Sequence, residues 1–216
     1  MFATLMLKTF ALLAGSLLVA YLGNLFAAKS LSAALQNNDI AKARRGQWIA
    51  LGAFIISFIA LMFLQTIFPW NFVFMLVFTF AGGMTLAVYT VAYGDLATKA
   101  LAITALTTLG TGIVAGLPGM DFSWMGKFLF IGILVLIIFS VIGLFVKMKS
   151  ARRPMAIFGV ILFTGYLLYD FNRLAKLQAM AEANNWNTAL NFAISIYLDI
   201  INLFIQLMNL LSSSSN

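Results

Sequence analysis

The segment NTALNFAISIYLDIINLFIQLMNLL, residues 187–211, is long and apolar enough to cross a membrane, yet it holds a carboxylate near its middle. About 20 mostly apolar residues in a helix span the hydrocarbon core of a bilayer. Asp199 at that depth adds roughly 2.5–3.5 kcal/mol to the free energy of membrane insertion. Such a residue usually faces the interior of a helix bundle or a wet cavity, so Asp199 is a candidate functional residue.

The polar residues of this segment are spaced three or four apart, which places them on one face of a helix, within an arc of about 80°. This polar stripe consists of Thr188, Asn191, Ser195, Asp199, Asn202, Gln206 and Asn209. Side chains of this kind either line a pore or cavity or form hydrogen bonds between membrane helices. Both interpretations stay open here. If the stripe is a lining, we expect that lining to include Asn191, Ser195, Asn202, Gln206 and Asn209.

The composition of the whole chain predicts a membrane protein. Of the 216 residues, 63% are apolar and 9% are charged, whereas about 25% are charged in soluble domains. The chain has no cysteine and no histidine, which excludes thiol nucleophiles, thiolate metal sites and the usual near-neutral pH switch. Proton chemistry is therefore left to the six acidic residues, Asp39, Asp95, Asp121, Asp170, Glu182 and Asp199. We expect no enzyme activity and no cofactor.

Hydropathy predicts an all-α protein with seven transmembrane helices in a single polytopic domain over residues 1–216. The expected spans are residues 4–26, 48–68, 72–93, 97–117, 127–146, 154–174 and 187–211. The longest polar stretch, residues 29–47, is expected to form a short interfacial helix between the first two spans. Asp39 and Asp121 are expected to be ordinary loop residues.

The basic residues lie mostly between spans, so we expect the net charge of +7 to face lipid headgroups rather than nucleic acid. One side of the membrane would carry nine of them, Lys29, Lys42, Arg44, Arg45, Lys99, Lys147, Lys149, Arg152 and Arg153. The other side would carry four, Lys8, Lys127, Arg173 and Lys176. The excess of basic residues on cytoplasmic loops then predicts an outside N-terminus and an inside C-terminus.

A second carboxylate, Asp170, lies near the end of the predicted span 154–174, with Tyr166 and Arg173 about one turn away on either side. If the last two spans pack together, Asp170 and Asp199 can meet. Two carboxylates in a poorly solvated site do not both ionise at low cost, so they share a proton. A proton would tie the helices together, whereas the fully ionised pair would repel or bind a hard cation such as calcium. The alternative is an Asp170–Arg173 ion pair beside a neutral Asp199.

Four stretches of the chain resemble the Bax-inhibitor-motif family. YDFNRL at 169–174 and YLDIINLFIQLMNLL at 197–211 are similar to its last two helices, MDFSWMGKFLF at 120–130 to a D-[LM]-S loop, and FTFAGGMTL at 78–86 to an F-x-x-x-G-[IL]-TL run. The matching positions in the last two helices are Tyr169, Asp170, Asn172, Leu198, Asp199, Asn202, Leu203 and Phe204. The resemblance covers the last fifty residues best and is almost absent before Phe72.

The resemblance implies a last helix at the centre, wrapped by the other six. It also implies a pH-sensitive calcium leak channel in which Asp170 and Asp199 sense pH and contact the transported calcium. The location would be the bacterial inner membrane with the N-terminus inside, which is opposite to the charge count. Bacterial relatives often carry a glutamate and an arginine in helix two, but the span 48–68 has no ionisable residue. An arginine is also often found where this chain has Asn209, so Lys99 and Arg173 are candidate charge partners.

Three other functions are alternatives to a channel. An intramembrane aspartyl protease would need a GxGD motif, and ISIYLDII at 194–201 has no glycine. A proton-coupled small-solute carrier would use the same pair of carboxylates. A non-transporting membrane interaction or stress-regulator protein would use the polar stripe only to hold helices together.

Overall fold

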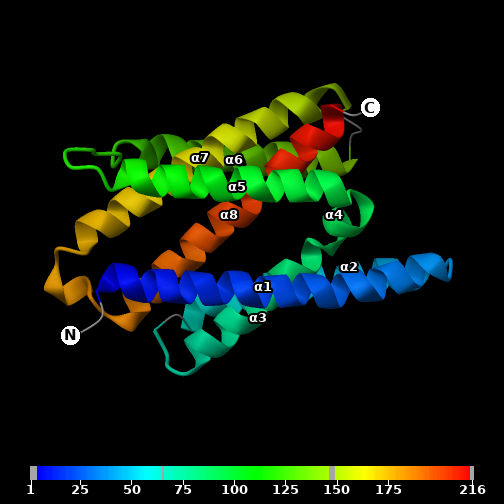
Figure 1. The fold of residues 1–216 in the computed structure, drawn as a ribbon, viewed down its shortest axis with the longest axis horizontal. Helices are drawn as coiled ribbons and strands as arrows, with labels where there is room; N and C mark the ends of the chain where they lie inside the picture. Colours follow the sequence, from blue (N-terminus) through cyan, green and yellow to red (C-terminus); the bar gives the residue numbers. More distant parts are fainter. Residues whose placement is uncertain (1–3, 65, 146–148, 215–216) are drawn as a thin grey trace. The chain divides into compact units, whose positions relative to one another are not determined.

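The computed structural model describes residues 4–64, 66–145 and 149–214, and within these ranges the protein contains helices and no strands (Figure 1). The α-helices are α1 (Leu5–Gln36), α2 (Ile40–Leu64), α3 (Trp70–Thr85), α4 (Ala87–Ala92), α5 (Gly94–Ala115), α6 (Met125–Phe145), α7 (Arg152–Leu177) and α8 (Trp186–Ser214). Two short 3-10 helices are η1 (Lys149–Ala151) and η2 (Ala181–Ala183). Counting α3 with α4, seven described stretches are long and apolar enough to cross a membrane. The prediction of an all-α protein with seven spans is confirmed.

The first two helices are longer than the sequence predicted. Residues 29–47 do not form a separate interfacial helix, because α1 continues to Gln36 and α2 begins at Ile40. The stretch is rich in good helix formers such as alanine, leucine, lysine and arginine, so it extends both helices instead. At a rise of 1.5 Å per residue, the 32 residues of α1 reach about 48 Å. This exceeds the hydrocarbon core of about 30 Å, so α1 extends beyond it.

The third span is interrupted instead of continuous. α3 ends at Thr85 and α4 begins at Ala87, with Leu86 between them. The Thr85 hydroxyl donates a 2.6 Å hydrogen bond to the carbonyl of Gly82. Adjacent glycines weaken a helix, and kinks commonly occur at such positions. We therefore attribute the break at Leu86 to Gly82 and Gly83, which lie within a span that was predicted as one continuous helix.

The chain groups into two compact units. The first comprises Met1–Gly94 with Asn185–Ile194, and the second comprises Asp95–Asn184 with Ser195–Asn216. Helix α8 contributes its beginning to the first unit and the rest to the second. Of the seven spans, α8 has the largest buried share, at 50% of its most apolar stretch. That the last helix is wrapped by the other six, and that residues 1–216 form one domain, stay predictions.

In the first unit, small residues let α1 and α3 approach until their backbones touch. On α1 the buried residues Ser16, Ala20, Gly23 and Ala27 recur every three or four positions. A Cβ atom added to Gly23 would lie 2.1 Å from the carbonyl oxygen of Phe80 on α3. A side chain larger than hydrogen is therefore excluded at this point, as in other membrane helix pairs joined through small residues.

In the second unit, α6 and α7 pack antiparallel through glycines that face side chains. Gly126 on α6 lies against the ring of Tyr169, and Gly132 lies against Leu162. On α7, Gly165 faces Leu129 and Gly159 faces the side chain of Gln206 on α8. These contacts place α7 between α6 and the second half of α8, and α7 is the helix that carries Asp170.

Candidate carboxylate site

Helices α7 and α8 place both candidate carboxylates in the second unit, in the interior of the protein. Asp170 and Asp199 are each 7% exposed. Asp199 lies near enough to Asp170 for their charges to interact, and Tyr166 lies near enough to interact with both. The Oδ2 atom of Asp199 is buried and has no hydrogen-bond partner among the described residues. An ionised carboxylate in that environment would be strongly destabilised without a proton or a cation.

The register between α7 and α8 explains this proximity. The start of α7 and the end of α8 line the same cavity, so the two helices run in opposite directions. Gly159 on α7 contacts Gln206 on α8. Seven residues later on α7 and seven residues earlier on α8, this register brings Tyr166 level with Asp199. Asp170 follows one turn later on α7. The two carboxylates therefore lie on facing helices within about one turn of each other.

The polar stripe of α8 is only partly enclosed. Asn191 and Ser195 are exposed, whereas Thr188, Asn202, Gln206 and Asn209 are half-buried. The Asn202 amide donates a 2.9 Å hydrogen bond to the carbonyl of Leu198 on its own helix. Between residues 191 and 209, none of the stripe side chains hydrogen-bonds to another helix within the described ranges. The stripe is therefore free of interhelical hydrogen bonds there, and its role as a lining stays a prediction.

The two predicted charge partners differ in position. Arg173 is exposed on α7 and its charge acts on Asp170, three residues earlier. Lys99 is exposed on α5 and makes no ion pair with any described residue. Arg173 thus acts on one of the two carboxylates, whereas the role of Lys99 as a charge partner stays a prediction.

The site has few acidic ligands for a metal ion. The described residues include no group of three or more His, Cys, Asp or Glu side chains that could hold one. Calcium takes six to eight oxygen ligands, so a cation at Asp170 and Asp199 would keep several water molecules.

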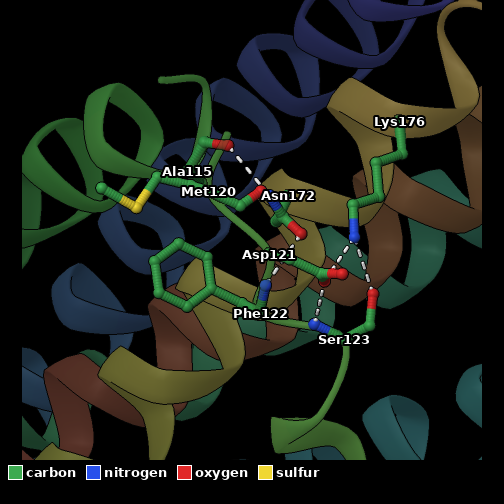
Figure 2. A network of polar contacts seen from close by, with 7 residues as sticks. All are labelled: Ala115, Met120, Asp121, Phe122, Ser123, Asn172 and Lys176. Carbon is green, nitrogen blue, oxygen red and sulfur yellow. Dashed lines mark hydrogen bonds and ion pairs between the residues drawn. The ribbon is translucent and has the colours of Figure 1, made fainter. Parts of the chain in front are cut away.

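A polar contact next to the carboxylates was missed by the sequence analysis. Asn172, two residues after Asp170, is buried and fixes the connection between α5 and α6 (Figure 2). Its Nδ2 donates to the carbonyl oxygens of Ala115 at 3.1 Å and Met120 at 3.0 Å, and its Oδ1 accepts the N–H of Phe122 at 3.1 Å. The sequence indicated Asn172 only as a matching position in YDFNRL, and no local pattern indicated its partners.

Asp121 is also more than an ordinary loop residue, because its exposed side chain anchors the connection between α5 and α6 at the protein surface (Figure 2). Its carboxylate forms an ion pair with Lys176 on α7 and accepts the N–H of Ser123 at 2.8 Å. Lys176 also donates to the Ser123 hydroxyl at 2.8 Å. The hydrogen bond from Lys176 is the largest cause that holds the pKa of Asp121 well below its usual range. The segment Asp121-Phe122-Ser123, which resembles the D-[LM]-S loop, therefore has a structural role in this chain.

The chain matches the family model described as "Inhibitor of apoptosis-promoting Bax1" over residues 3–216. It is also similar to an uncharacterised protein of Campylobacter jejuni, with 29% identity over 212 residues, which cover 95% of this chain and 87% of that protein. Protein LIFEGUARD 4 of Arabidopsis thaliana is 33% identical over 152 residues, covering 66% of this chain and 57% of the plant protein.

A viral relative matches a shorter part of the chain. The Golgi anti-apoptotic protein of vaccinia virus is 34% identical over 95 residues, which cover 44% of this chain and 38% of the viral protein. The family match extends over nearly the whole sequence and confirms the resemblance first found in the loop and helix motifs. The chain belongs to the Bax inhibitor family of membrane proteins.

Proposed function

We propose that this protein is a pH-sensitive cation leak channel that carries calcium and is gated by Asp170 and Asp199. The observation that carries the proposal is the buried Oδ2 atom of Asp199, which has no hydrogen-bond partner among the described residues. A second carboxylate lies close enough for its charge to act on Asp199. A buried acceptor of this kind needs a proton or a cation, and both can reach it only through a wet path.

The gate works through one proton shared by the two carboxylates. With the proton present, the pair forms a hydrogen bond that holds α7 and α8 together and closes the path. As the pH rises, the proton leaves and the two negative charges repel each other. The open, doubly ionised state attracts a hard cation, and calcium suits oxygen ligands best. The leak therefore increases with pH.

The polar stripe of α8 supplies the rest of the path in this proposal. Exposed Asn191 and Ser195 lie on one side of Asp199 along the helix, and half-buried Asn202 and Gln206 lie on the other. Their oxygen atoms can replace part of the hydration shell of a cation. The proposal assigns no residue to bond-breaking chemistry and needs no cofactor.

The bacterial inner membrane is the proposed location, supported by the similarity to the protein of Campylobacter jejuni. Its sidedness is testable because the chain has no cysteine. A cysteine introduced at Asn38, in the turn between α1 and α2, should react with a membrane-impermeant thiol reagent only from the cytoplasm if the charge count is right. Reaction from outside alone would favour the orientation implied by the resemblance.

Proteoliposomes that contain a calcium indicator test the function. We expect the wild-type leak to increase as pH rises, and we expect Asp170→Asn and Asp199→Asn each to abolish that dependence on pH. Asp39→Asn is the matched control, because this carboxylate is exposed and accepts the N–H of Lys42 at 2.9 Å. Unchanged pH profiles in both test variants would refute the gate. A wild-type protein without leak would favour a non-transporting interaction protein.

A further inference from the structure

A cavity of about 370 Å³ lies in the second unit, where α6 ends, α7 begins and α8 ends. Its volume falls within the range of about 300–1,000 Å³ that is typical of small-molecule sites. Its lining residues come from these three helices and, at Ala151, from η1, and all of them lie within the described ranges. Because the ends of membrane spans meet here, the cavity lies at a membrane edge rather than at the depth of Asp199.

The walls of the cavity combine apolar, cationic and amide groups. Leu136 and Phe139 on α6 and Met155 on α7 supply apolar surface, and Arg152 supplies a guanidinium group at the start of α7. On α8, Asn209 and Gln206 supply amides. A ligand that satisfies this lining is an amphiphile with an anionic head and an apolar tail.

The charge around the cavity also favours an anionic ligand. The lining residue Arg152 is followed by a second basic residue, Arg153, and the sequence has no acidic residue between Asp121 and Asp170. Arg152 is exposed and has no ion-pair partner among the described residues. Basic pockets between transmembrane helices are known sites for anionic lipid headgroups.

We propose that this cavity binds one anionic phospholipid. The phosphate lies against the guanidinium of Arg152 and accepts N–H bonds from the amides of Gln206 and Asn209. The acyl chains follow the apolar wall formed by Leu136 and Phe139. The inference does not depend on leak activity, since it concerns only the retention of a lipid.

Native mass spectrometry of the full-length protein tests the site. The protein is reconstituted in vesicles of equal parts phosphatidylglycerol and phosphatidylcholine, and the lipids that stay bound after extraction are identified. We expect one retained lipid per chain, and we expect it to be phosphatidylglycerol. Equal retention of both lipids, or displacement of the retained lipid by millimolar inorganic phosphate, would overturn the proposal.

Two neighbouring arginines provide a matched pair of charge variants. One basic residue near an anionic lipid surface changes affinity by about fivefold. Arg152→Gln should therefore lower the ratio of phosphatidylglycerol to phosphatidylcholine by about fivefold, and Arg152→Lys should restore most of it. Arg153→Gln removes the same charge one residue away but outside the lining, and it should leave the ratio unchanged. Equal losses in Arg152→Gln and Arg153→Gln would mean general surface attraction and would contradict a site.

Two glycines provide a matched pair of volume variants. Gly143 lines the cavity, and a Cβ atom added there would meet nothing within 4 Å. Gly143→Phe should fill the space and reduce retention of any lipid by at least fivefold, without disturbing the fold. Gly110→Phe is the control, because Gly110 is exposed on α5 and also has open space around it. Full lipid retention in Gly143→Phe would overturn the proposal, provided that both variants remain helical and monodisperse.

Discussion

The helix pairs α1–α3 and α6–α7 are both joined through glycines, but these glycines meet different neighbours. A Cβ atom added to Gly83 on α3 would lie 1.8 Å from the backbone oxygen of Ala20, which cannot move without its helix. A Cβ atom added to Gly165 on α7 would lie 2.9 Å from a terminal methyl group of Leu129, which can rotate away. The packing of the first pair is therefore rigid toward an added methyl group, whereas the packing of the second pair is adaptable. The adaptable pair is the one that includes α7, the helix that carries Asp170.

The largest expected loss of stability comes from substitutions that disrupt the rigid packing of α1 against α3. Gly83→Ala and Gly23→Ala each force a methyl group against a backbone carbonyl, so each should destabilise the protein by more than about 3 kcal/mol. Gly15→Ala on α1 is the control, because nothing lies within 4 Å of its added Cβ, and it should be neutral or slightly stabilising. Equilibrium unfolding in detergent measures all three. Similar stabilities for Gly15→Ala and Gly83→Ala would show that the backbones are not in contact.

The next effect concerns the connection beside the carboxylates. Asn172→Ala removes three hydrogen bonds and leaves two carbonyls and one N–H without partners. We expect a loss of about 2–3 kcal/mol in stability, because part of the connection can be rehydrated. Thr108→Ala removes one hydrogen bond within α5 and serves as the control. The same measurement would contradict the role of Asn172 if the two variants were equally stable.

A smaller effect sharpens the contrast between the two helix pairs. Gly165→Ala should cost less than about 1.5 kcal/mol, because the side chains of Leu129 and Met125 can repack around the added methyl group. Thermal unfolding of Gly165→Ala beside Gly83→Ala is the direct comparison. Equal losses would remove the distinction between rigid and adaptable packing.

The smallest effect depends on pH. The pKa of Asp121 is held below its usual value near 3.9 by Lys176, so the ion pair stabilises the folded state above that pH. The contribution disappears as pH falls through the lowered pKa. Asp121→Asn should be slightly less stable than wild type at pH 7, and the difference should vanish in strong acid. A difference that is the same at both pH values would contradict the ion pair.

The spans and the buried carboxylates could be predicted from local sequence. Hydropathy and the spacing of polar residues within a helix do not depend on distant partners. The polar stripe and the carboxylates at Asp170 and Asp199 were found in this way. Asn172 and Asp121 lie in the motifs noted in the sequence, but their contacts were not predicted because their partners lie 50 and 55 residues away along the chain. Only folding brings α7 against the connection between α5 and α6, so no local pattern could assign these contacts.

The most direct test of the shared proton is infrared spectroscopy of the carboxyl C=O stretch as a function of pH. In reconstituted wild-type protein, we predict a band from a buried, protonated carboxyl group that disappears over the pH range in which the calcium leak increases. The band should be lost in Asp199→Asn, should titrate over a different pH range in Asp170→Asn, and should be unchanged in Asp39→Asn. A wild-type protein without a titrating band, or a band that persists in both test variants, would contradict the gate.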